Sequence, residues 1–479
     1  MKKYKKLGLL LLIIIIPCMF LLTGCGLFAQ KVYVTNIVKT ETIGTTDTYT
    51  IYYSNGTTTV LNIENGKDGK DGENLTLDSI KEYCDANNID FETYLKSYLT
   101  IEYNPNIIKT ATNKAIDSTV NIYTEFRKAT RYGTTTYYDS FLSAGAGVIY
   151  KMDMLNNQIN PNGYSYIITN FHVIYDKDST NKYADVIRLY QHTKIASVGI
   201  SESTDSNGYP IVQCSEGVVL GTYIGGAMNY DIAVIQVKTS DLLLNNPNAK
   251  PVKIASSYEP ADMAIAIGNP EGEGTSVTSG IISVKSEYLT MSAVDGISEI
   301  DLRVMRIDTA VNGGNSGGGL FNENGELIGI VNAKVIDNEI DNISYALPYD
   351  NVTKVADNII YYYKQQTINP QPVKVKKLHL GINYSTIINE HLLISSVDAN
   401  SFAYDIGLKS NDIITKMKIN NTVYNIDYHY QLGDALLNIR KGDKVLFTIT
   451  RIINNVETEL TLGITTSTGV ESSYIETIQ

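Results

Sequence analysis

A mainly β fold is the class that this sequence predicts for the residues between 112 and 350, on two observations. Short runs rich in β-branched and apolar residues recur there, and turn-forming residues separate them. Few stretches between these runs repeat apolar residues at the helical spacing. The pattern is typical of an all-β barrel or sandwich. In chain order the runs are STVNIY, GAGVIY, SYIITN, DIAVIQV, MAIAIG, RVMRID and LIGIVNAK.

The composition of the whole chain narrows the functional classes. Its 479 residues are too many for one hydrophobic core and predict two or three domains. The formal net charge is −12, and nucleic-acid binding needs clustered Lys and Arg, so we predict no nucleic-acid partner. Tyrosine is abundant, with 35 residues against no tryptophan, which by itself indicates no function.

The first residues predict an export signal. A basic MKKYKK precedes the apolar LGLLLLIIIIPCMFLL, which is shorter than the roughly 20 residues of a membrane-spanning helix. LTGC, ending at Cys25, follows and resembles the lipobox of bacterial lipoproteins. The resemblance implies that residues 1–24 are cleaved as a signal peptide and that Cys25 carries the lipid. An uncleaved membrane anchor is the alternative, and both place the remaining chain outside the cytoplasm at the cell membrane.

The cysteines predict neither a metal site nor a disulfide framework. Cys18 leaves with the signal peptide, and Cys25 is the lipidation candidate. Cys84 and Cys214 lie far apart, without CxxC or metal-ligand spacing, so we expect two buried free thiols, with a disulfide between them as the alternative. We predict no metal and no cofactor.

Residues 25–75 are predicted to form a tether. Threonines alternate with apolar residues on both sides of SNG, which predicts one small hairpin. Three Gly-X-Y triplets at 66–74 are too few and too poor in proline for a collagen helix, and they predict a solvated spacer. Apolar residues near helical spacing predict one or two short helices within residues 76–103.

The β-rich part ends in a predicted helix. PYDNVTKVADNIIYYYKQQ, residues 348–366, repeats apolar residues at helical spacing. A Pro- and Lys-containing linker, TINPQPVKVKK, follows and leads into a second β-rich unit.

Ser316 lies among glycines in IDTAVNGGNSGGGLFN and is the candidate nucleophile. A serine hydroxyl needs an imidazole base and a carboxylate that orients it. His172 follows the β-rich YSYIITN, at the end of a predicted strand. Asp231 precedes the buried strand IAVIQV, where a histidine N–H would compensate its charge. Asp308 is the rival, but it is too close to Ser316 along the chain to lie behind that histidine.

The glycines around Ser316 predict an oxyanion hole. Its donors would be the backbone N–H groups of Gly314 and Ser316, and a side chain at 314 would crowd the substrate carbonyl. GNSGG also fits the G-x-S-x-G elbow of α/β-hydrolases, which needs a helix after the serine and the order Ser, acid, His. A hairpin-like GGGLFNENGELIGIV follows here, and both candidate partners precede the serine, so the elbow is disfavoured.

Seven stretches in order resemble the HtrA/DegP family of trypsin-like serine proteases. They are SAGAGVIY, YIITNFHVI, YDIAVIQV, AIAIGNP, VTSGIIS, DTAVNGGNSGGGLFN, and LIGIVNAK with ISYALP. The resemblance implies a chymotrypsin-like double β-barrel over residues 110–363. It implies His172 as general base, Asp231 as the group that orients it and Ser316 as nucleophile.

The resemblance also implies an apolar S1 pocket. Ala310, six residues before the serine, would form its floor, and Ile330 and Val331 would line it. Such a pocket favours small or medium aliphatic residues and disfavours Lys and Arg.

Residues 376–466 resemble a PDZ domain, with a generic β-sandwich as the alternative. LHLGI resembles the loop that binds a peptide carboxylate, through Leu380, Gly381 and Ile382, and GLKSNDII resembles a following turn and strand. A PDZ groove adds a peptide C-terminus to its sheet as an extra strand.

Three departures from the family pattern stand out. The interval between His172 and Asp231 is expanded by HTKIASVGISESTDSNGYPIVQC, a predicted ribbon or loop at the rim of the cleft. Gly319 stands where proline or alanine is common, and only one PDZ-like unit is present. None of these changes removes a member of the predicted triad.

Two functions follow as expectations. The first is a membrane-tethered HtrA-type endopeptidase that cleaves unfolded or damaged exported proteins. Its partners would be unfolded polypeptides, peptide C-termini at the PDZ groove, the membrane through a lipid anchor and, from the family, two further copies in a homotrimer. The alternative is a catalytically silent PDZ-bearing chaperone or binding protein at the cell surface, which has no need of all three triad residues.

Overall fold

The chain divides into two compact units, Met1–Pro105 and Asn106–Gln479. The expected signal peptide, the lipidation site Cys25 and the Gly-X-Y segment lie outside the described residues. The computed structural model describes residues 34–43, 46–53, 56–64, 77–87, 106–333, 343–386, 392–466 and 468–478.

The first unit has one strand more than the predicted hairpin. Its antiparallel sheet runs β1-β2-β3, with β2 paired on both sides. Asp47 explains the added strand, because its buried carboxylate pairs with the Lys39 ammonium at 2.7 Å and accepts from the Thr42 hydroxyl. The elements are β1 (Val34–Ile43), β2 (Thr46–Tyr53), β3 (Thr58–Glu64) and helix α2 (Leu77–Ala86).

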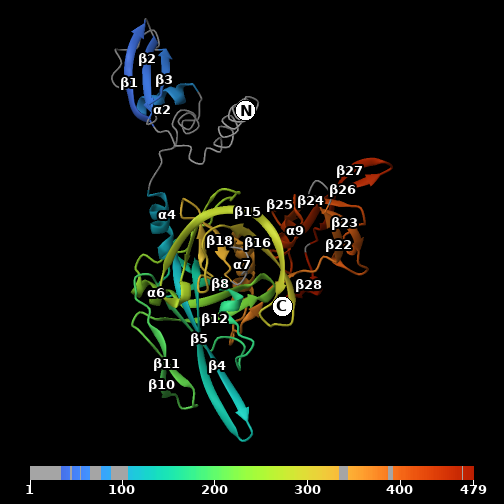
Figure 1. The fold of residues 1–479 in the computed structure, drawn as a ribbon. Coiled ribbons are helices and arrows are strands. Elements are labelled where there is room, and N and C mark those ends of the chain that lie inside the picture. Colours follow the sequence, from blue (N-terminus) through green and yellow to red (C-terminus); the bar gives the residue numbers. More distant parts are fainter. Residues whose placement is uncertain are drawn as a thin grey trace, which may run out of the picture. The chain divides into compact units, whose positions relative to one another are not determined.

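The second unit begins with helix α4 (Ile107–Ala115) and a closed β-barrel (Figure 1). The strand order is β13-β8-β5-β4-β9-β12, and the pairing of β12 with β13 closes the barrel. Its strands are β4 (Thr119–Tyr132), β5 (Thr135–Met152), β8 (Tyr164–Asn170), β9 (Val186–Tyr190), β12 (Val219–Ala227) and β13 (Ile232–Lys238). Helix α6 (Thr239–Asn245) follows the last of them.

A second closed barrel follows, so the predicted mainly β class and double barrel are confirmed. Its order is β14-β15-β16-β19-β18-β17. The two barrels share one core with α7 (Tyr349–Lys364), whose buried residues recur at helical spacing. The strands are β14 (Met263–Gly268), β15 (Ser276–Ser292), β16 (Glu299–Ile307), β17 (Gly319–Phe321), β18 (Leu327–Val331) and β19 (Ser344–Pro348).

The insertion after His172 forms a two-stranded antiparallel ribbon of β10 (Val198–Thr204) and β11 (Pro210–Cys214). It lies beside the long β4–β5 hairpin, which extends beyond the barrel (Figure 1). Arg127 joins the two, 3.3 Å from the Asp205 carboxylate and 5.2 Å above the Tyr209 ring. The expectation that Cys214 is buried is wrong, because the end of this ribbon exposes it, whereas Cys84 is buried.

The C-terminal part of the second unit has its own sheet and core. The sheet order is β22-β23-β24-β26-β27, with β25 on β24. Its elements are β21 (Lys376–Leu378), β22 (Ile382–Thr386), β23 (Leu392–Val397), α8 (Phe402–Asp405), β24 (Ile413–Ile419), β25 (Thr422–Asn425), α9 (His429–Leu436), β26 (Val445–Ile453), β27 (Val456–Ile464) and β28 (Ile475–Thr477). The linker adds β20 (Val373–Lys374) beside β12, and β28 pairs with β21.

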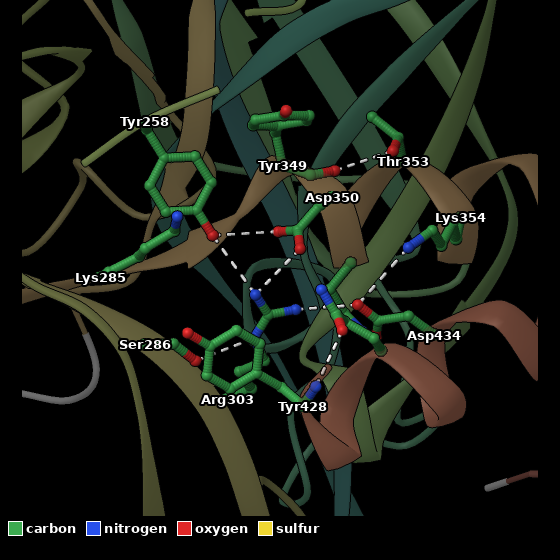
Figure 2. Close-up of polar contacts among 12 residues, drawn as sticks. Tyr258, Lys285, Ser286, Arg303, Tyr349, Asp350, Thr353, Lys354, Tyr428 and Asp434 are labelled. Atoms are coloured by element: carbon green, nitrogen blue, oxygen red, sulfur yellow. Dashed lines mark hydrogen bonds and ion pairs between the residues drawn. The ribbon is translucent and has the colours of Figure 1, made fainter. Parts of the chain in front are cut away.

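A buried arginine joins the second barrel to α9 (Figure 2). Arg303 of β16 donates to Asp434 of α9 at 2.8 Å and to Asp350 of α7 at 2.9 Å. Its guanidinium lies 3.8 Å from the centre of the Tyr430 ring. Because a buried guanidinium needs anionic partners, this contact fixes α9 against the barrel.

Candidate active site

His172 and Ser316 meet at the junction of the two barrels. His172 lies in the one-turn helix α5 (Phe171–Ile174), which begins where β8 ends, and its Nε2 is 2.8 Å from Ser316 Oγ. The carbonyl of Ser316 accepts the Ala146 N–H at 2.8 Å, and Thr169 Oγ1 donates to the Ala146 carbonyl at 2.7 Å. The first barrel therefore holds the serine backbone against the end of β8.

Asp231 completes a continuous chain of polar contacts. Its Oδ2 is 2.7 Å from His172 Nδ1, and its Oδ1 accepts the His172 backbone N–H at 3.0 Å. The residue has a left-handed backbone with φ 49°, which costs free energy outside glycine. Two contacts to its carbonyl, from the Phe171 N–H and the Asn170 amide, both at 3.0 Å, hold that conformation. Asp308 lies elsewhere, since its Oδ1 accepts the Ile281 N–H of β15 at 2.6 Å.

Two further groups at the site have no equivalent in the sequence prediction. The amide of Asn332, fully buried, donates to Asp231 Oδ2 at 2.9 Å. The backbone N–H of Ala333 donates to Ser316 Oγ at 3.2 Å. A polar residue directly after the apolar LIGIV is the only signal in the sequence, and it does not reveal a partner across the barrel.

The backbone around Gly314 turns two N–H groups away from the loop. The Gly313 carbonyl accepts from Glu271 at 2.8 Å, and the Asn315 carbonyl accepts from Gly318 at 3.0 Å. In a trans peptide the N–H points opposite to the carbonyl, so the N–H groups of Gly314 and Ser316 point the other way. Within the part of the chain that the structure describes, neither N–H has an acceptor.

Gly314 must be glycine for a reason other than the predicted one. Its φ is +91°, and a Cβ there would lie 2.2 Å from the Asn269 carbonyl oxygen. The clash is with the protein's own loop rather than with a substrate carbonyl. Gly317 is equally constrained, since a Cβ would lie 2.1 Å from Thr169 Oγ1.

The predicted S1 residues lie in different surroundings. Ala310 is exposed, and its carbonyl accepts the Thr278 hydroxyl at 2.7 Å. Ile330 packs in the core shared by the barrels, whereas Val331 packs inside the second barrel with Val311 and Ala333. Successive strand residues point to opposite faces, and the lining of an S1 pocket by these residues stays a prediction.

The predicted carboxylate loop lies between β21 and β22. Gly381 has φ +71°, and Leu380 is buried, with its carbonyl accepting the Ala403 N–H at 2.9 Å. Strand β22 ends the sheet order, so its outer edge can accept another strand. The ring of Tyr384 on β22 lies 6.2 Å from that of His429 at the start of α9.

Neither a metal cluster nor a membrane span occurs in the described ranges. Among those residues, no three His, Cys, Asp or Glu side chains are grouped so that they could hold a metal ion. No helix among them is long and apolar enough to cross a membrane.

Comparisons with known proteins agree with this geometry. Residues 145–330 match the trypsin-like peptidase domain family. "Serine protease Do-like HtrA" of Bacillus subtilis is 27% identical over 298 residues, covering 58% of this chain and 55% of that protein. "Serine protease Do-like HtrB" of the same species is 26% identical over 321 residues, covering 64% and 59%. The chain therefore spans just over half the length of these two relatives.

Solved structures of the same kind are also similar. The "HtrA-type protease AlgW with decapeptide" shows 20% identity and a TM-score of 0.45, covering 74% of this chain and 97% of that one. A serine endoprotease from Yersinia pestis shows 23% identity and a TM-score of 0.39, covering 75% and 97%. The matched family segment contains the whole chain of contacts from Asp231 through His172 to Ser316. The two closed barrels and the matched segment therefore identify a trypsin-like peptidase domain of the serine protease type, in a chain similar to HtrA/DegP proteases.

Proposed function

We propose that this protein is a serine endopeptidase with Ser316 as nucleophile. The observation that carries the proposal is the unbroken polar chain from Asp231 Oδ2 to His172 Nδ1 at 2.7 Å and from His172 Nε2 to Ser316 Oγ at 2.8 Å. Since a carboxylate accepts at Nδ1, that nitrogen carries the proton and Nε2 is left as the base.

The proposed reaction proceeds through an acyl-enzyme. Ser316 Oγ attacks the scissile carbonyl as His172 Nε2 takes its proton, and Asp231 stabilises the imidazolium that forms. The oxyanion is received by the N–H groups of Gly314 and Ser316, which point away from their loop. His172 then returns the proton to the leaving amine, and a water molecule hydrolyses the ester by the same route.

The proposed substrates are unfolded or damaged exported proteins. The relatives' names support a Do-like or HtrA-like protease and name no substrate. For the S1 pocket we retain Ala310, and the burial of Val311 and Ala333 beside Val331 supports an apolar wall. We expect cleavage after small or medium aliphatic residues.

The proposed domain organisation adds peptide recognition and a membrane anchor. Residues 110–363 would form the protease and residues 376–466 the PDZ domain. The edge of β22 beside α9 supports the capture of peptide C-termini, with the loop at Leu380, Gly381 and Ile382 binding the carboxylate. Lipidation of Cys25 and homotrimerisation remain proposals from the sequence.

A direct test uses soluble protein comprising residues 26–479. Wild type and Ser316→Ala are incubated with casein, and fragments are followed by mass spectrometry. We expect fragments only with wild type, ending in residues such as Val, Ala or Ile. Absence of cleavage, even with hydrophobic C-terminal peptides added, would favour a silent PDZ-bearing binding protein.

A further inference from the structure

A pocket lined by aromatic rings lies beside the His172–Asp231 pair. Its volume is about 210 Å³, and four rings form most of its wall. The lining residues are Phe171, Tyr175, Tyr183, Tyr223, Gly226 and Met228, with the charged residues Asp295 and Lys374 completing it. It is smaller than the roughly 300–1,000 Å³ of pockets that enclose a whole small-molecule ligand. Its size therefore suits a single side chain.

The rings form a continuous wall. Ring centres are 5.5 Å apart for Phe171 and Tyr175, 5.5 Å for Tyr175 and Tyr183, and 5.1 Å for Tyr183 and Tyr223. Gly226 allows the rings to pack this closely, because a Cβ there would lie 2.7 Å from the Phe171 ring and 2.9 Å from the Tyr223 hydroxyl. Since each ring packs on the next, the wall keeps its shape when the pocket is empty.

Two chain connections place this pocket next to the candidate active site. Phe171 directly precedes His172 in α5. Met228 lines the pocket, and the Met228 carbonyl accepts the Asp231 N–H at 3.1 Å. Both connections place the pocket within a few residues of the His172–Asp231 pair along the chain.

A second hollow extends the surface away from the active site. It measures about 620 Å³ and shares Tyr183, Tyr223 and Lys374 with the first. It follows β12 to residues 371–374, which connect the barrels to the C-terminal sheet. The two hollows therefore lie next to each other along β12, with Tyr183 and Tyr223 lining both.

We propose that the ring-lined pocket binds an aromatic or aliphatic side chain of the polypeptide substrate, several residues away from the scissile bond. Aromatic walls favour apolar partners. Contact between two aromatic rings is more favourable than the burial of their surface area alone accounts for. The inference rests on the proposed endopeptidase function and deepens it. It makes the enzyme select an exposed apolar residue at a second position, which unfolded chains present and folded proteins bury.

The test compares long and short substrates. A short ester occupies only the nucleophile and S1, whereas long peptides carry one Phe moved through the positions on both sides of a fixed cleavage site. For wild type we expect one position of Phe to raise kcat/KM about tenfold over the same peptide with Ala at that position. This is the scale of the effect when one apolar side chain enters a pocket.

Variants of Tyr183 then test the pocket. In Tyr183→Ala that preference is lost, and in Tyr183→Phe, which keeps the ring, it remains. Tyr164→Ala serves as a matched control, since Tyr164 is a half-exposed tyrosine at the start of β8, outside the pocket lining.

Each other outcome has a distinct meaning. If wild type cleaves long peptides with no preference for the position of Phe, or if Tyr183→Ala keeps the preference, the pocket proposal is wrong. If Tyr183→Ala lowers activity on ester and peptides by the same factor, the ring supports only the fold, and the proposal is again wrong. If wild type cleaves neither substrate and Ser316 does not react with an active-site probe, the endopeptidase function itself fails.

Discussion

At the scale of single residues, the charge on Asp231 is the most demanding feature of the site. The carboxylate is buried, and it accepts from the His172 ring, the His172 backbone and the Asn332 amide. Burial of a charge is costly unless hydrogen bonds compensate it. Asn332 is therefore a positioning residue, because its amide supports the carboxylate that orients the base.

Replacing Asn332 tests this role. In Asn332→Ala we expect kcat to fall about tenfold or more, since a hydrogen bond to a charged group contributes about 1.5–3 kcal/mol. KM should change little, because the amide acts through Asp231. Both constants are measured by peptide kinetics, and the rate of the inactive Ser316→Ala variant is subtracted as background. A rise in KM at unchanged kcat would instead place Asn332 at the substrate.

The sequence predicted His172 and Asp231 from their positions next to β-rich runs, and Ser316 from the glycines around it. Asn332 was missed because its partner depends on the pairing of β18 with the segment after Ser316, where the Val331 N–H donates to the Gly318 carbonyl at 2.8 Å. The faces that Ile330 and Val331 occupy follow from the same register, which residue spacing alone does not give. Residue type and spacing predict which groups react, and register decides which groups support them.

At the scale of elements, α9 is joined to the second barrel by one buried cation. Arg303 donates to Asp434 and Asp350, and the Asn351 amide also donates to Asp434 at 2.6 Å (Figure 2). Breaking such a group by removing one partner leaves a buried charge uncompensated. This contact could not be predicted from residue spacing, because its members come from three separate elements.

Removing the cation should therefore destabilise the second unit. In Arg303→Met we expect the free energy of unfolding to fall by about 3–5 kcal/mol. The double variant Arg303→Met/Asp434→Leu should recover part of the loss, because it also removes the stranded carboxylate. Thermal and denaturant unfolding measure both. An unchanged unfolding free energy in the single variant would contradict the structural role.

His429 makes the α9 contact sensitive to acid. Burial, with the nearby Arg303 charge, lowers the pKa of His429 below its ordinary 6.5. The unfolded chain then binds the proton first as pH falls, so the contribution of His429 to stability declines from about pH 7 downward. Tyr288, Tyr384 and Asp434 also border the same cavity.

A matched variant isolates the histidine from those neighbours. His429→Gln stays neutral at every pH, so we expect its Tm to fall less than that of wild type between about pH 7 and pH 5. The contributions of the other titratable groups are the same in wild type and in His429→Gln, so they cancel when the two falls in Tm are subtracted. Equal falls in Tm would show that His429 does not carry the effect.

At the scale of the whole molecule, the sequence predicted the double barrel but not its extensions. The barrels were predictable because each strand is an apolar run between turns, and closure removes the exposed edges. The β4–β5 and β10–β11 ribbons, by contrast, are joined by Arg127, Asp205 and Tyr209, which no periodicity links. In the first unit, β1 was not predicted, and its exposed Lys39 pairs with the buried carboxylate of Asp47 on β2.

The cysteines report on both units at once. Cys214 is exposed on the β10–β11 ribbon, whereas Cys84 is buried in the first unit. In native protein comprising residues 26–479 we expect one thiol to react rapidly with a maleimide, and Cys214→Ser to abolish that reaction. Mass spectrometry of the labelled peptides identifies the site. Rapid labelling of Cys84 would show that the first unit is not folded as described.

The most direct test of the central claim is covalent labelling of the nucleophile. Protein comprising residues 26–479 is incubated with a fluorophosphonate probe, which reacts with an activated serine, and the adduct is located by peptide mapping. The polar chain from Asp231 through His172 predicts one adduct, on Ser316, and its loss in His172→Ala. No adduct on wild type, or an adduct that survives in His172→Ala, would contradict the claim that this histidine activates this serine.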